Sequence, residues 1–180
     1  MPRSRVEGKA WISHQIPRLR PSTLLDVGPG AGTYANLLSA LIPGARWSCV
    51  EIYEPYVEMF GLRRKYHDVH VQDIRSFPWL RHYDVVILGD VLEHLSLGDA
   101  LAVWRRARLN AAYIVLSIPI VEYPQGPEYG NVHETHRQDW SHDMVMTCLT
   151  GIVRWQRNPT IGTYLARGAR APSHALEPSP

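Results

Sequence analysis

Residues 23–38 read TLLDVGPGAGTYANLL, and this stretch decides the fold. A short apolar run at 24–27 is followed by Gly28, Gly30 and Gly32, and apolar residues then return at helical spacing. A buried strand, a tight turn and an amphipathic helix are the simplest interpretation. Glycine suits such a turn because it tolerates positive φ and lets a ligand approach the backbone. The stretch therefore predicts a binding site for a nucleotide-type cofactor.

The glycine spacing and one acidic residue discriminate between cofactors. The spacing here is G-x-G-x-G, whereas dinucleotide dehydrogenases favour G-x-G-x-x-G. Asp26 stands two residues before the first glycine, where a carboxylate would repel a pyrophosphate but can pair with an ammonium group. The pattern D-x-G-x-G-x-G resembles the first motif of the class I S-adenosylmethionine-dependent methyltransferases. Their cofactor has an amino acid end and no phosphate, and the resemblance implies that Asp26 and the glycines bind it.

Length and composition limit the class of protein. A chain of 180 residues that is 45% hydrophobic predicts a single α/β domain. A net charge of +2 gives no electrostatic argument for a nucleic acid or an anionic membrane. Cys49 and Cys148 lack disulfide or thiolate-metal spacing, and no apolar run is long enough to span a membrane. Without a signal-peptide core, we expect a cytoplasmic protein with no membrane partner, and a nucleic-acid partner is not indicated.

Strands and helices alternate along the rest of the chain. Strands are predicted at 46–52, 67–71, 83–89 and 111–118, and helices at 54–65 and 139–150. The residues around 157–159 predict an antiparallel hairpin. The expected fold is α/β, with a doubly wound, mostly parallel seven-stranded sheet, helices on both faces and a C-terminal antiparallel hairpin. This topology is similar to that of the class I methyltransferases.

One domain accounts for the whole pattern. We assign it to 1–167, with an N-terminal helix within 1–21 and a substrate loop at 119–138. We expect 168–180 to form a disordered tail, because this segment is rich in proline and poor in apolar residues.

Acidic residues at strand ends extend the cofactor site. Glu51 ends the second strand, one βαβ step after Asp26, where a carboxylate can accept hydrogen bonds from both ribose hydroxyls. The resemblance places Asp73 at the adenine amino group, with Ile74 as an apolar wall, and Asp90 at the methionine end of the cofactor or at the substrate. The predicted cofactor-binding residues are Asp26, Gly28, Gly30, Gly32, Glu51, Ile52, Asp73, Ile74 and Asp90.

Histidines supply the predicted catalytic group. Methyl transfer to a hydroxyl needs a proton acceptor, and histidine titrates near neutrality. His94 follows the fourth strand, and His133 and His136 lie in the loop after the fifth. The carboxyl ends of these strands flank one crevice in an open α/β sheet. We therefore predict a catalytic role for these histidines in an O-methyltransferase that acts on a small-molecule or glycan hydroxyl. A homodimer would help to close the pocket.

Three alternatives stay open. The pattern Asp90-x-x-Glu93-His94 with His133-x-x-His136 resembles the metal-binding pattern of the small-RNA 3′-terminal 2′-O-methyltransferases, in which two acids and two histidines hold a divalent ion. Asp90 stands where that family has Glu, and the loop between the two halves is unrelated, so we predict no metal ligand. The chain could also be a non-catalytic cofactor-binding module of a larger assembly, or a nicotinamide oxidoreductase.

Overall fold

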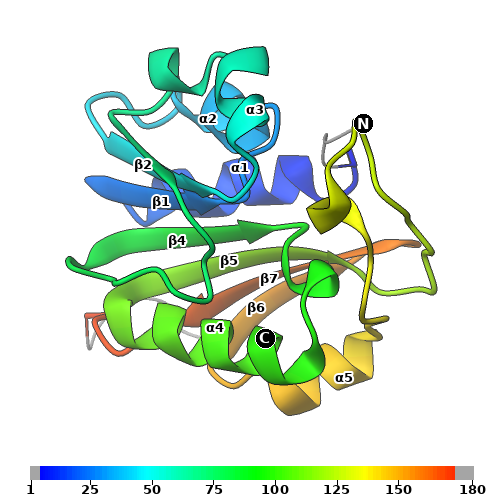
Figure 1. Cartoon of the computed structure of the whole chain (residues 1–180). Helices are drawn as coiled ribbons and strands as arrows, with labels where there is room; N and C mark the ends of the chain where they lie inside the picture. The colour runs from blue at the N-terminus through cyan, green and yellow to red at the C-terminus, as the bar shows by residue number, and fades with distance from the viewer. Residues whose placement is uncertain (1–4, 173–180) are drawn as a thin grey trace.

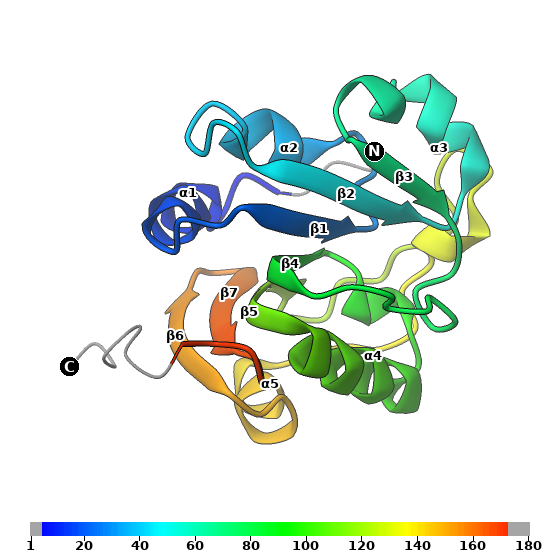
Figure 2. The ribbon, with the colours of Figure 1, turned by 90° about the vertical axis from the view of Figure 1, so that its left-hand side faces the viewer.

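The computed structural model describes residues 5–172, which form a seven-stranded sheet covered by helices (Figure 1). The strands are β1 (Thr23–Val27), β2 (Arg46–Glu51), β3 (Asp68–Val71), β4 (Tyr83–Gly89), β5 (Ala111–Pro119), β6 (Ile152–Arg157) and β7 (Ile161–Arg167). Their order across the sheet is β3-β2-β1-β4-β5-β7-β6 (Figure 2). The pairs β5–β7 and β6–β7 are antiparallel and the other pairs are parallel. The predicted doubly wound sheet with a C-terminal hairpin is confirmed.

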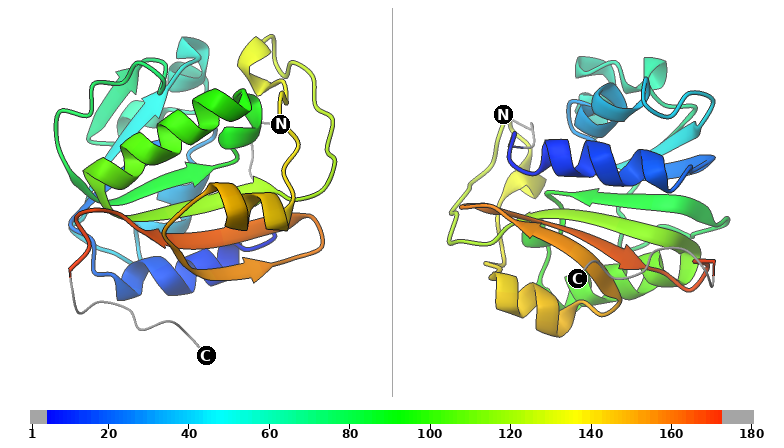
Figure 3. Two further views of the ribbon diagram at one scale, coloured as in Figure 1. Left: turned by 90° about the horizontal axis from the view of Figure 1, so that it is seen from below. Right: turned by 180° about the vertical axis from the view of Figure 1, so that it is seen from behind.

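Helices cover both faces of the sheet (Figure 3). They are α1 (Lys9–Arg18), α2 (Thr33–Leu38), α3 (Glu54–Met59), α4 (Leu97–Asn110) and α5 (His142–Cys148), with 3₁₀ turns η1 (Leu62–Arg64), η2 (Leu92–His94) and η3 (Val132–Glu134). Ile12 of α1 packs in one core cluster with Ile87, whereas Val103 of α4 packs in the other with Leu88. β4 is therefore covered on both sides, which explains its almost continuous apolar sequence. No helix of residues 5–172 is long and apolar enough to cross a membrane.

Two helices are shorter than the sequence pattern predicts. The helix expected at 54–65 ends at Met59 and is followed by Gly61, whose φ of 60° is left-handed. Such a glycine terminates an α-helix, and the chain resumes as η1. The helix expected at 139–150 begins only at His142, because the Ser141 side chain accepts a hydrogen bond from Met144 N at 3.1 Å and caps the helix.

The chain after β7 folds back onto the domain. Gly168 N donates to Ala112 O at 2.8 Å, and Ala169 N donates to Arg108 O at 2.7 Å. These bonds hold the start of the predicted disordered tail against the end of α4 and the beginning of β5. Residues 173–180 of that tail, like residues 1–4 of the predicted N-terminal segment, lie outside the described part of the chain.

The carboxyl ends of the parallel strands meet at one edge of the sheet, next to the loop at 119–138 (Figure 2). The segments that follow β1 and β4 are tied to neighbouring strands at this edge. Gly28 N donates to Val50 O at 2.9 Å, and Asp90 N donates to Ser117 O at 2.8 Å. The glycine turn and η2 therefore start from fixed positions beside each other.

The opposite edge of the sheet carries a charge cluster around Asp68 at the start of β3. The Asp68 carboxylate accepts hydrogen bonds from Arg46 Nη2 at 3.0 Å, Arg81 Nη2 at 2.5 Å and Ser48 Oγ at 2.9 Å. The Arg46 hydrogen bond, with those of Arg81 and Ser48, holds the pKa of Asp68 well below its usual range. A carboxyl group with a lowered folded pKa stabilises the fold above its unfolded pKa, and this stability is lost as the pH falls.

We therefore expect Asp68→Asn to lower the free energy of unfolding at neutral pH by about 1 kcal/mol, since the group is partly exposed. Urea unfolding measures this difference. The deficit should shrink as the pH falls below about 4, because the unfolded chain then takes up a proton at Asp68 while the folded protein still holds the carboxylate, so wild type loses its advantage. Glu58→Gln is the matched control, because Glu58 makes only an exposed ion pair with Arg63 at 3.7 Å. If Asp68→Asn lowered the free energy of unfolding by the same amount at acidic pH, the ionic role of Asp68 would be contradicted.

Candidate active site

A cavity of about 320 Å³ opens at the carboxyl ends of the parallel strands, between the glycine turn and the loop at 119–138. Of the residues that the sequence predicts for the site, only Asp26 and Gly32 do not line it. Those that line it are Gly28, Gly30, Glu51, Ile52, Asp73, Ile74, Asp90, His94, His133 and His136. The fold thus gathers side chains from five separate segments around one space.

The glycine turn needs the residue type that the sequence supplies. Gly28, Gly30 and Gly32 have φ values of 60°, 49° and 73°, in the left-handed region that strains other residues. A Cβ on Gly28 would lie 3.1 Å from Val91 Cγ2, so the turn also packs closely on the segment after β4. Gly32 has another role, since a Cβ there would lie 2.8 Å from Cδ of Lys65, whose Nζ donates to the Ala31 carbonyl.

Asp26 occupies the core and not the cavity. It is fully buried, and its Oδ2 accepts a hydrogen bond from Tyr66 Oη at 2.5 Å. Burial raises the pKa of Asp26 to about 7, although the Tyr66 hydrogen bond acts in the opposite direction. The predicted direct pairing of Asp26 with a cofactor ammonium group therefore does not fit the geometry. The hydrogen bond from Tyr66 holds the Asp26 side chain within the core.

The part of the cavity beside β2 and β3 is suited to a nucleoside. Glu51 is 3% exposed, its Oε1 accepts a hydrogen bond from Tyr53 N at 2.9 Å, and burial raises its pKa to about 7. Ile52 and Ile74 add apolar walls. The Asp73 carboxylate accepts a hydrogen bond from Arg75 Nη2 at 2.6 Å, which lowers the pKa of Asp73. The sequence did not reveal that Arg75 engages this acid.

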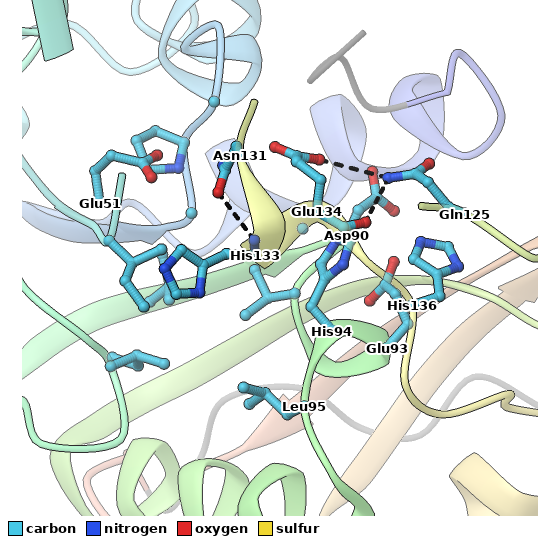
Figure 4. A pocket seen from close by; sticks show the side chains of 18 of the residues that line it. Glu51, Asp90, Glu93, His94, Leu95, Gln125, Asn131, His133, Glu134 and His136 are labelled. Atoms are coloured by element: carbon cyan, nitrogen blue, oxygen red, sulfur yellow. Dashed lines mark hydrogen bonds between the residues drawn. The ribbon is translucent and has the colours of Figure 1, made fainter. Parts of the chain in front are cut away.

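His94 and His136 face each other across the other part of the cavity (Figure 4), with ring centroids 4.8 Å apart. The Nδ1 of His136 lies 2.6 Å from the Tyr123 carbonyl oxygen, and that of His94 lies 3.4 Å from the Thr135 carbonyl oxygen. A carbonyl can only accept a hydrogen bond, so each Nδ1 carries the proton and each Nε2 keeps a lone pair. Burial lowers the pKa of both imidazoles, that of His94 to about 4.

Backbone hydrogen bonds bring the two histidines together. Arg137 N and Gln138 N both donate to Glu93 O, at 2.8 and 3.1 Å, and His136 N donates to Gln125 O at 3.0 Å. These bonds fix the loop after β5 against η2, the turn after β4. The position of His136 relative to His94 therefore depends on main-chain contacts between two distant segments.

Glu93 adds a buried carboxylate to this pair. It is 1% exposed, and neither of its carboxylate oxygens accepts a hydrogen bond from another residue of 5–172. One ligand atom from each of Glu93, His94 and His136 lies within 4.8 Å of the others. Burial, together with the negative charge of Asp90, raises the pKa of Glu93. Asp90 itself has a φ of 57°, and such strain in a non-glycine residue is typical of functional sites.

His133 lies apart from the histidine pair. It is exposed, and its N donates to Asn131 Oδ1 at 3.0 Å. Figure 4 shows its side chain apart from those of His94 and His136. The structure thus does not bring His133 together with the other two predicted catalytic residues.

The loop also contributes residues outside the predicted catalytic set. Gln125 Nε2 donates to the Glu134 carbonyl oxygen at 2.8 Å, and both side chains line the cavity. Of the loop aromatics, Tyr123 lines the cavity, whereas Trp140 is 2% exposed and packs in the core. Trp140 therefore anchors the end of the loop and is not available to a ligand.

Comparisons with known proteins agree with this geometry. The profile of a family described as "Methyltransferase domain" matches residues 8–164. No curated protein sequence matches the chain. The N-terminal domain of EvdMO1, solved with SAH and D-fucose, has a TM-score of 0.66 at 13% identity and covers 92% of this chain and 84% of that chain.

Two further solved structures have the same fold. The PH0226 protein from Pyrococcus horikoshii has a TM-score of 0.66 at 14% identity, over 89% of this chain and 87% of that chain. Human N-acetylserotonin methyltransferase in complex with SAM has a TM-score of 0.66 at 19% identity, over 90% of this chain and 52% of that chain. This chain therefore spans about half of the human enzyme. The family profile covers the chain from the residue before α1 into β7. The chain therefore belongs to the methyltransferase-domain family and is an S-adenosylmethionine-dependent methyltransferase with the class I fold.

Proposed function

We propose that the chain transfers a methyl group to a hydroxyl of a small-molecule or sugar-like acceptor, and that His136 accepts the hydroxyl proton. The observation that carries this proposal is the pair His94 and His136, whose Nδ1 atoms are held by backbone carbonyls beside the buried Glu93 carboxylate. A group with a free Nε2 lone pair, held in place by the main chain, meets the requirement for a general base.

The cavity fits the cofactor. When bound, S-adenosylmethionine supplies a methyl group on a positively charged sulfur. Glu51 would accept hydrogen bonds from the ribose, Ile52 and Ile74 would cover the adenine, and Gly28 and Gly30 would admit the chain of the methionine end. The left-handed glycines leave room for that close approach. The cavity acids favour a ligand with a positive charge.

Asp90 would receive the cofactor ammonium group. It lines the cavity at the end of β4, and its backbone is held in a strained conformation by the hydrogen bond from its N to Ser117 O. Asp73 contributes to the adenine side only together with Arg75, because the guanidinium already occupies its oxygens. Asp26 has no direct part in this assignment.

His136 is better suited than His94 to take up the proton. The pKa of His94 is lowered to about 4, with burial as the first cause and the neighbouring His136 as the second, so that imidazole resists protonation. The negative charge of Asp90 opposes the effect of burial on His136. The Glu93 carboxylate lies within the same cluster and would stabilise the imidazolium that forms.

Loop residues suggest an acceptor with several hydroxyl groups. Gln125 and Glu134 place an amide and a carboxylate on the cavity wall, and such groups bind vicinal hydroxyls through paired hydrogen bonds. Tyr123 provides an aromatic surface beside them. The EvdMO1 domain, which has a similar fold, was solved with D-fucose, and this supports a sugar-like acceptor.

A second candidate function uses the same three side chains as metal ligands. One carboxylate and two imidazoles whose ligand atoms lie within 4.8 Å of one another match the donor set of a Mg²⁺ or Mn²⁺ site. The carbonyl contacts at both Nδ1 atoms also resemble the outer contacts that orient metal-binding histidines. The chain would then be a metal-dependent ribose 2′-O-methyltransferase of RNA.

The histidine assignment makes a first prediction. His136→Ala should lower kcat by about 10²- to 10⁴-fold, the usual contribution of a general base, and leave cofactor affinity nearly unchanged. S-adenosylhomocysteine release can be measured with a panel of free and nucleotide-linked sugars, and mass spectrometry then locates the methyl group. His82→Ala, at an exposed position outside the cavity, is the matched control. If the wild-type protein methylates none of these acceptors, the result favours the alternative that the chain is a non-catalytic cofactor-binding module.

Metal removal separates the two candidate functions. With His136 as the base, dialysis against a chelator should leave methylation of a hydroxyl acceptor unchanged, because no step requires an ion. Loss of activity that Mn²⁺ restores, together with methylation of an RNA 3′-terminal ribose, would replace the first function by the second. Isothermal titration of Mn²⁺ into wild type and His136→Ala provides a readout that does not depend on activity.

The ribose assignment predicts a pH-dependent affinity for S-adenosylhomocysteine. Below its pKa of about 7, Glu51 is protonated and loses one acceptor position, so affinity should fall as the pH is lowered. We expect a loss of about tenfold between about pH 8 and about pH 5.5, measured by calorimetry. Glu51→Gln should bind weakly throughout and show a flat profile, whereas the exposed Glu58→Gln should retain the slope. If the affinity of Glu51→Gln still changed with pH as that of wild type does, the pH dependence would belong to another group.

A further inference from the structure

Lys9 of α1 is a buried cation beside the active site. It is 8% exposed, and among residues 5–172 it is the one lysine or arginine that is buried. Its Nζ donates to Tyr34 Oη at 2.6 Å and lies 4.3 Å from the centre of the Tyr34 ring. Removal of an ammonium group from water is unfavourable, and a methionine would fill the same space without that cost. The position therefore calls for a functional explanation.

The charges of three carboxylates act on this ammonium group. Burial lowers the pKa of Lys9, and the charges of Asp90, Asp26 and Glu93 act in the opposite direction. These acids come from the end of β4, from β1 and from η2. Lys9 therefore carries a positive charge close to the segments that border the cavity.

Tyr34 connects Lys9 to the cavity. Its side chain is 2% exposed yet lines the cavity, at the start of α2. The ring lies directly on Gly89, where any Cβ would collide with it, so the ring position is fixed. A phenol oxygen that accepts a hydrogen bond from an ammonium group can still donate its own O–H, and the nearby cation strengthens that donor.

We propose that Lys9 and Tyr34 recognise the carboxylate of the methionine end of S-adenosylmethionine. This inference rests on the cofactor placement proposed above: with the nucleoside on the side of Glu51, the amino acid end extends towards β1 and β4, where Tyr34 and Asp90 both line the cavity. Tyr34 donates its O–H to the carboxylate, and Asp90 receives the ammonium group. Lys9 does not line the cavity and is a positioning residue that acts through Tyr34.

Decarboxylated S-adenosylmethionine isolates this interaction, because it lacks only the carboxylate. By calorimetry, wild type should bind S-adenosylmethionine at least about tenfold more tightly than the decarboxylated compound, as expected for a charge-assisted hydrogen bond. Lys9→Met and Tyr34→Phe should each weaken S-adenosylmethionine binding by about tenfold and leave the decarboxylated compound within about twofold of wild type. The double variant should be no weaker than either single variant, since both act on one contact.

The controls distinguish recognition from a structural role. Arg18→Met removes an exposed cation from the same helix and should keep the wild-type preference. Tyr34→Phe keeps the ring that packs on Gly89, so it tests the proposal even if Lys9→Met does not fold. The proposal would be overturned if the variants lost affinity equally for both compounds. It would also be overturned if Tyr34→Phe still bound S-adenosylmethionine more tightly than the decarboxylated compound by the wild-type factor. The ratio of the two cofactor affinities is measured without an acceptor, so a failure of the His136 assignment does not affect it. If wild type binds neither compound, the cofactor site itself is contradicted.

Discussion

The left-handed backbone of the glycine turn is the constraint on which the site depends. With Gly28, Gly30 and Gly32 all at positive φ, the chain turns from β1 into α2 without the strain that a side chain would introduce at these three positions. The segment after β4 can then approach to within contact of Gly28 through Val91. Because both segments start from adjacent strands, their close approach leaves one cavity at the carboxyl edge, where open α/β sheets bind ligands.

Burial of charge is the second feature of the site. Asp26, Glu51 and Glu93 are each at most 3% exposed, and desolvation is the first cause that raises the pKa of all three. Buried acids without full compensation reduce stability, so their retention indicates a function. In the function proposed above, a cofactor with a sulfonium and an ammonium group would offset this negative charge, and Lys9 offsets part of it within the protein itself. The acids that destabilise the free protein would then favour the bound cofactor.

The sequence predicted those features that local patterns determine. β4 and β5 are evident because both faces are covered and their sequences are almost continuously apolar. Glu51 and His94 followed from their places at strand ends. Asp26 was misplaced because alternation along a strand tells which face a residue occupies, but not whether that face opens into a cavity. The choice between His133 and His136 depends on the bonds from Arg137 N and Gln138 N to Glu93 O, which involve only the main chain and leave no pattern in the sequence.

The two parts of the cavity differ in what fixes them. On the nucleoside side, strand ends and glycines define the space, and a change of residue type there would strain the backbone or remove an acceptor. On the acceptor side, main-chain hydrogen bonds to Glu93 and Gln125 hold the loop that carries His136. In the function proposed above, the side chains of Gln125 and Glu134 on the same wall would determine which acceptor binds. This separation explains how a fold with a fixed cofactor site can serve different acceptors, since function resides in the site and not in the fold.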